Sequence, residues 1–120
     1  MDIKLASPAP TNQATFIVRQ LSGTDKTASV RVTHSSVSFS IHASDADGTV
    51  DEHVSFPMGD NGEFHRYVFT IGTDGSARWT LVGTEGQVGL AATNFDVPGP
   101  MVMGVEGFAA NFDNAYVTEP

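Results

Sequence analysis

Apolar and polar residues alternate one by one along most of the chain. In the segment 36–42, Val37, Phe39 and Ile41 alternate with serines. Successive side chains of a β-strand point to opposite faces, so this pattern predicts a strand with one buried and one solvent-facing side. Comparable segments cover 14–21, 28–33, 50–56, 63–71, 76–83, 87–92, 101–105 and 112–118. No window keeps the 3.6-residue period of a helix, so the sequence predicts an all-β protein.

Turn-forming residues separate these segments. Gly, Asn, Asp and Ser cluster at 22–25, 45–48, 59–62 and 72–75. About nine short strands divided by such turns are typical of an antiparallel β-sandwich or a small barrel. We therefore expect one β-sandwich domain over residues 14–120, with a jelly-roll-like arrangement of strands.

The first thirteen residues have a different character. Pro8 and Pro10 alternate there with small residues, which predicts a flexible N-terminal arm or linker over 1–13. Asp2 and the short apolar stretch do not fit a signal peptide. An initiating Met before a linker-like segment suggests a domain taken from a larger protein, which we expect to be extracellular or on a virion or cell surface.

Charge and composition exclude several classes of function. Six Lys and Arg face fourteen Asp and Glu, for a formal net charge of −8, and such a surface repels nucleic acid. The chain has no Cys, which excludes disulfides and thiolate chemistry. No apolar run approaches the roughly 20 residues of a membrane-spanning helix, so we expect no membrane insertion.

Two parts of the chain resemble concanavalin A-like and laminin G-like domains. The first part reads FHRYVFT at 64–70, DG at 74–75 and RWTLVG at 78–83, which is similar to a hairpin of those domains. The second part has MG at 103–104, GF at 107–108 and FDNAYV at 112–117, which is similar to their closing strands. The resemblance covers about half of the chain and implies a jelly-roll that binds carbohydrate or acts in adhesion. Where that family usually has Asp-Gly, this chain has Val82-Gly83.

Candidate ligand-binding residues are those that a sugar site needs. Sugar rings stack on aromatic side chains, and their hydroxyls need polar partners. Trp79 is the only Trp and is either such a platform or part of the core, and Leu81 on the same strand face favours the core. The further candidates are Tyr67, His65, Arg31 and His42.

An acidic segment is the best candidate for a metal site. Asp45, Asp47, Asp51 and Glu52 surround Gly48, and Ca²⁺ prefers carboxylate oxygens in a glycine-containing loop. The spacing does not complete an EF-hand, so a solvated acidic turn is the alternative. The four histidines show no zinc-binding spacing.

The sequence shows no recognisable set of catalytic residues. The chain lacks the E-x-D-x-x-E carboxylates of jelly-roll hydrolases and the G-x-S-x-G motif of serine hydrolases. We therefore expect a non-catalytic carbohydrate-binding or adhesion module, whose partner is a glycan or a cell-surface or virion protein. One alternative is a structural module of a virion fibre, capsid decoration or surface layer that forms homo-oligomers through its β surface. Another is a small hydrolase or lyase.

Overall fold

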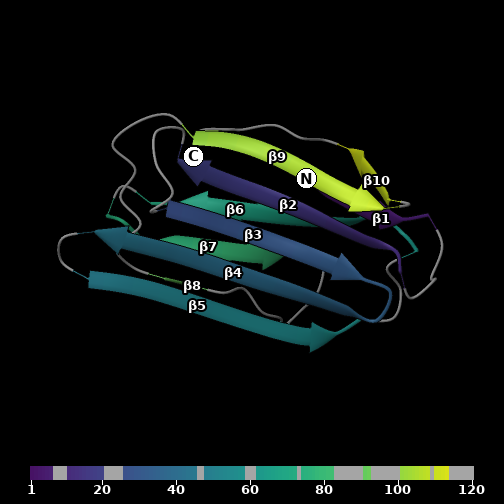
Figure 1. Cartoon of the computed structure of the whole chain (residues 1–120), viewed down its shortest axis with the longest axis horizontal. Coiled ribbons are helices and arrows are strands. Elements are labelled where there is room, and N and C mark those ends of the chain that lie inside the picture. The colour runs from purple at the N-terminus through teal and green to yellow at the C-terminus, as the bar shows by residue number, and fades with distance from the viewer. Residues whose placement is uncertain are drawn as a thin grey trace.

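The described residues form two antiparallel sheets of five strands each, packed face to face, in a computed structural model of the chain (Figure 1). The structure describes residues 1–6, 11–20, 26–45, 48–58, 62–72, 74–82, 91–92, 101–108 and 110–113. None of them belongs to a helix long and apolar enough to cross a membrane. The predicted all-β sandwich is confirmed.

The front sheet, which is nearer the viewer in Figure 1, has the strand order β5-β4-β3-β2-β9. Its strands are β2 (Gln13–Gln20), β3 (Lys26–Thr33), β4 (Ser36–Asp45), β5 (Gly48–Pro57) and β9 (Met101–Phe108). The back sheet has the order β10-β1-β6-β7-β8. Its strands are β1 (Asp2–Leu5), β6 (His65–Ile71), β7 (Ala77–Leu81), β8 (Ala91–Ala92) and β10 (Ala110–Asp113).

Consecutive strands are neighbours in most of both sheets. β2 to β5 form one meander and β6 to β8 form another, and β9 pairs with β2 while β1 and β10 complete the back sheet. This order is consistent with a β-sandwich, and it does not confirm the jelly-roll connectivity. The front sheet is consequently a wide, regular surface of paired strands.

The core lies between the two sheets and is centred on Trp79. The indole is fully buried, stacks on Phe39 at 5.8 Å between ring centroids, and meets the edge of Phe16 at 5.7 Å. Its Nε1 donates a hydrogen bond of 3.1 Å to the backbone oxygen of Ser40. Trp79 stands on the back sheet and its partners stand on the front sheet, so this one side chain joins the two sheets.

The start of the chain differs from the prediction. Asp2–Leu5, expected to belong to a flexible arm, forms β1 in the interior of the back sheet, where Ile3 and Leu5 are 1% exposed. The prediction of an arm was wrong for these residues because Ile3 and Leu5 alternate with Asp2 and Lys4 and supply an apolar face. Asp2 also accepts two hydrogen bonds, of 2.8 and 3.2 Å, from the guanidinium of Arg66.

Candidate functional site

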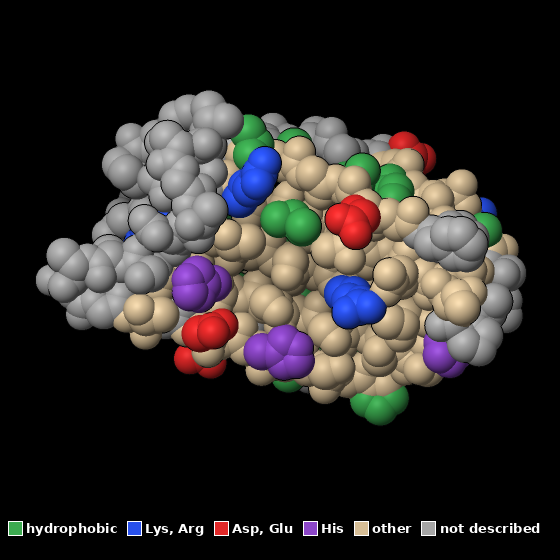
Figure 2. Space-filling view, viewed as in Figure 1, with side chains coloured by type: hydrophobic (Ala, Val, Ile, Leu, Met, Phe, Trp, Pro, Cys, Tyr) green, Lys and Arg blue, Asp and Glu red, His purple; other side chains and the backbone are tan. Residues whose placement is uncertain are grey.

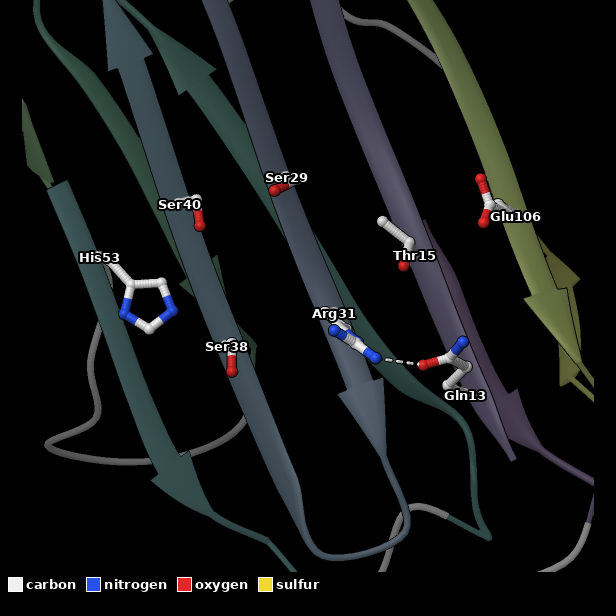
Figure 3. A pocket seen from close by; sticks show the side chains of 8 residues that line it. All are labelled: Gln13, Thr15, Ser29, Arg31, Ser38, Ser40, His53 and Glu106. Atoms are coloured by element: carbon white, nitrogen blue, oxygen red, sulfur yellow. Dashed lines mark hydrogen bonds between the residues drawn. The ribbon is translucent and has the colours of Figure 1, made fainter. Parts of the chain in front are cut away.

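A polar groove of about 450 Å³ lies on the outer face of the front sheet. Its lining comes from all five strands of that sheet (Figure 3). The lining residues are Gln13, Thr15, Ser29, Arg31, Ser38, Ser40, His53 and Glu106. This volume is within the roughly 300–1,000 Å³ that is typical of small-molecule sites.

Differences in side-chain length produce the groove. Thr15, Ser29, Ser38 and Ser40 are short and half-buried, and we call these four residues the floor. Longer side chains stand beside and between these four residues, and among them Arg31, His53 and Glu106 are exposed. The alternation that places apolar residues in the core thus places hydroxyls on the opposite face.

Strand register aligns the lining residues in rows across the sheet. One row runs from β5 to β9 through Ser55, Ser38, Arg31, Thr15 and Glu106, each opposite the next on the neighbouring strand. Two hydroxyls of this row, those of Ser38 and Ser55, lie 3.0 Å apart. Neighbouring strands are about 4.8 Å apart, so Arg31 and Glu106, separated by one strand, stand roughly 10 Å from each other.

Arg31 is oriented by Gln13. Its Nη2 donates a hydrogen bond to the side-chain oxygen Oε1 of Gln13 on the neighbouring strand (Figure 3). A guanidinium carries five N–H donors, so this bond uses only part of its capacity. The amide nitrogen Nε2 of Gln13 carries two more donors. Arg31 and Gln13 together therefore present several N–H donors at one side of the floor.

Charge on this face is sparse. The described residues of the groove include one cation, Arg31, and one anion, Glu106, together with His53. Figure 2, which looks onto the same face, shows a few charged and histidine side chains spread over a surface that is mostly uncharged and includes some hydrophobic side chains. Hydrogen-bonding groups, rather than a block of charge, therefore dominate the chemistry of the groove.

Two of the predicted ligand-binding residues belong to the core. Trp79 and Tyr67 are both 0% exposed, and the ring of Tyr67 meets that of Phe39 at 6.2 Å. Burial confirms the core alternative that Leu81 favoured for Trp79, and the prediction that Trp79 or Tyr67 contacts a ligand was wrong because both side chains point between the sheets. Neither side chain can serve as a surface platform for a sugar ring.

The other three ligand candidates lie on different sheets. Arg31 lines the groove, and His42 lies on the same face of the front sheet, with Nδ1 4.0 Å from Oδ1 of Asp51. His65 is half-buried on β6 of the back sheet, opposite Ile3. The structure therefore places Arg31 and His42 on one face and separates His65 from them.

Two of the four acidic candidates, Asp51 and Glu52, point to opposite faces of β5. Asp51 lies opposite His42, whereas Glu52 lies opposite Ile41 and thus points to the other face of β5. Asp45 ends β4, and Asp47 lies outside the described residues. Among the residues that the structure describes, no group of three or more His, Asp or Glu side chains is arranged to hold a metal ion. Asp47 is needed to complete the predicted calcium site and is not described, so the site of Asp45, Asp47, Asp51 and Glu52 stays a prediction.

Seven lining residues were not among the predicted site residues. These are Gln13, Thr15, Ser29, Ser38, Ser40, His53 and Glu106. Alternation within 28–33 and 36–42 indicates which side chains share a face within each strand. It does not indicate that β9 lies beside β2, and that pairing is what brings Glu106 into the row of Arg31.

Comparison of the chain with protein-family models, with curated proteins and with solved structures finds no match. The resemblance to concanavalin A-like domains remains a prediction.

Proposed function

We propose that the protein is a non-catalytic carbohydrate-binding module and that it binds its ligand in the groove on the front sheet. The observation that carries this proposal is the composition of the groove lining. Four hydroxyl side chains, a carboxamide, a guanidinium, an imidazole and a carboxylate line one hollow of about 450 Å³. A ligand rich in hydroxyl groups can both donate to and accept from such a set.

The arrangement supports binding better than catalysis. The groove contains a single carboxylate among the described residues, whereas glycoside hydrolysis commonly uses a pair. Its lining side chains stand on paired strands, which position binding groups more rigidly than loops do. The described lining of the groove includes no Trp, Tyr or Phe on which a sugar ring could stack. Polar contacts alone favour a modest affinity, because each neutral hydrogen bond contributes only about 0.5–1.5 kcal/mol net.

A glycan array probed with the 120-residue chain tests this proposal. The variant Ser40→Gln places a longer side chain on the floor, and we expect it to weaken binding to any positive glycan by about tenfold or more, equivalent to about 1.4 kcal/mol. The matched control is Thr80→Gln, on the outer face of the back sheet, which should bind like the parent chain. Melting curves establish that both variants are folded.

The array also has a result that contradicts the proposal. If no glycan binds, the protein is not a carbohydrate-binding module. If binding occurs but Thr80→Gln and Ser40→Gln behave alike, the groove is not the site. The alternative of a structural assembly module stays a prediction, and the hydrophilic surface of the groove does not add support to it.

A further inference from the structure

The groove presents donors and acceptors at different positions. Arg31 on β3 and Gln13 on β2 present N–H donors, and Glu106 on β9 presents only acceptors when ionised. Thr15 separates Arg31 from Glu106 along the row. The described residues show no ion pair between Arg31 and Glu106, so each keeps its own charge available to a ligand.

The donors of Arg31 and Gln13 suit a carboxylate. A guanidinium matches the two oxygens of a carboxylate in a bidentate pair, and charge-assisted bonds of this kind are roughly twice as strong as neutral ones. Oε1 of Gln13 accepts from Arg31, and this bond directs the amide so that Nε2 is left as a donor. A ligand oxyanion can therefore take N–H bonds from both residues at once.

We propose that the groove selects saccharides that carry a carboxylate, with Arg31 and Gln13 holding the carboxylate and the floor hydroxyls meeting the sugar hydroxyls. This inference rests on the proposed carbohydrate-binding function and adds the chemical class of the ligand. In this proposal, the carboxylate of the ligand lies beside Arg31 and Gln13, and the hydroxyl-bearing part of the sugar extends over Ser38 and Ser40 (Figure 3).

The net charge of the protein does not by itself favour an acidic ligand. With a formal charge of −8, the chain as a whole repels anions. Binding of an acidic saccharide must then come from a specific contact rather than from general attraction. A neutral ester of the same saccharide is accordingly expected to bind at least about tenfold more weakly than the acid, since one charge-assisted contact is worth about 1.5–3 kcal/mol. Dextran sulfate, which is highly charged but lacks carboxylates, is the control for general attraction to polyanions.

The experiment compares each acidic polysaccharide with its neutral ester. Polygalacturonate, alginate and hyaluronan are titrated by calorimetry against the intact chain, beside their esterified forms and dextran sulfate. We expect at least one acid to bind about tenfold or more tightly than its ester. Arg31→Gln should remove this preference, while Arg78→Gln, which changes an exposed arginine on the back sheet, should keep it.

Glu106→Gln gives an independent readout. Removing a negative charge roughly 10 Å from Arg31 should tighten binding of a carboxylate on the order of twofold at low salt. A neutral ligand would instead gain nothing from the lost charge.

Two results overturn the inference, and they can be told apart. If esters bind as tightly as acids, or dextran sulfate binds as tightly as the carboxylated ligands, the carboxylate preference is wrong while carbohydrate binding stands. If no member of the panel binds and the glycan array is also blank, the proposed function fails, and the inference fails with it.

Discussion

Trp79 is a single residue whose contacts extend to both sheets. Its ring contacts Phe39 and Phe16 on the front sheet, and Phe69 beside it on the back sheet lies 4.9 Å away between centroids. The hydrogen bond from Nε1 to Ser40 satisfies the one polar atom of the buried indole. Trp79 therefore belongs to the core, as its place on the same strand face as Leu81 indicated, and it does not serve as a sugar platform.

Truncation of this side chain should be costly. We expect Trp79→Ala to lower the free energy of unfolding by about 3–5 kcal/mol, because it removes a large buried side chain and leaves a cavity. Arg78→Ala, an exposed neighbour on the same strand, should change it by less than about 0.5 kcal/mol. Denaturant unfolding measures both values, and a loss below about 1 kcal/mol for Trp79→Ala would contradict this description of the core.

A second residue-scale prediction concerns the hairpin turn between β6 and β7. Oδ1 of Asp74 accepts hydrogen bonds from the hydroxyl of Ser76 at 2.6 Å and from its backbone N–H at 3.1 Å. These bonds stabilise the carboxylate and lower the pKa of Asp74 below its ordinary value. In the same turn, Gly75 has a φ of 83°, a conformation that favours glycine.

Ser76→Ala should raise the pKa of Asp74 toward the ordinary value, because the larger of the two hydrogen-bond contributions is lost. A pKa lowered on folding means that ionised Asp74 stabilises the fold above its unfolded pKa, and that this contribution disappears as the pH falls through the folded pKa. NMR titration of the Asp74 carboxyl carbon measures the change. Ser38→Ala serves as the control, and an unchanged midpoint in Ser76→Ala would refute the role of the hydroxyl.

At the scale of elements, β1 is the clearest addition to the sequence-based prediction. It pairs with β10 over four residues and with β6 at Asp2 and Ile3, so it lies between these two strands in the back sheet. The N-terminal ammonium donates to the backbone oxygen of Tyr67 at 3.0 Å and extends the pairing to Met1. Burial of this ammonium lowers its pKa.

Leu5→Ala distinguishes a structural strand from a flexible arm. Because Leu5 is 1% exposed, we expect a loss of about 2–5 kcal/mol in the free energy of unfolding. The neighbouring Lys4 points outward, with its Nζ 4.9 Å from the ring centre of Phe64, and Lys4→Ala should cost no more than about 1 kcal/mol. Equal and small losses in both variants would show that β1 does not form.

Most strands could be predicted from the sequence because their alternation is long enough to detect. β3, β4, β6 and β7 follow the expected pattern, and their inward residues are those of the core. β1 was missed because four alternating residues close to two prolines give a weak local signal. The partners of β1 and β9 were also inaccessible, because local alternation carries no information on which distant strands pair.

The candidate site was predictable only in part, for the same reason. The alternation of side chains along β3 and β4 places Arg31, Ser38 and Ser40 on the face opposite the core. Gln13 lay within the predicted arm, and Glu106 lay just beyond a predicted strand, so neither was predicted as a ligand-binding residue. Trp79 and Tyr67 were candidates for their chemistry, and their burial depends on the packing of the second sheet.

At the scale of the whole molecule, the two outer faces differ. The front sheet carries the groove, with hydroxyls on its floor and longer polar side chains around it (Figure 3). On the back sheet, Val68 and Val82 are 37% and 49% exposed, close to the ion pair of Arg66 and Asp2. The front sheet therefore offers the better surface for a ligand rich in hydroxyl groups.

The most direct test of the proposed site is an NMR map of backbone amide shifts on addition of a polysaccharide that the chain binds. The structure predicts that the largest changes cluster at the floor and at Gln13, Arg31 and Glu106, with little change at Arg78 and Thr80. Changes concentrated on the back sheet, or around His65, would contradict the assignment of the groove as the binding site.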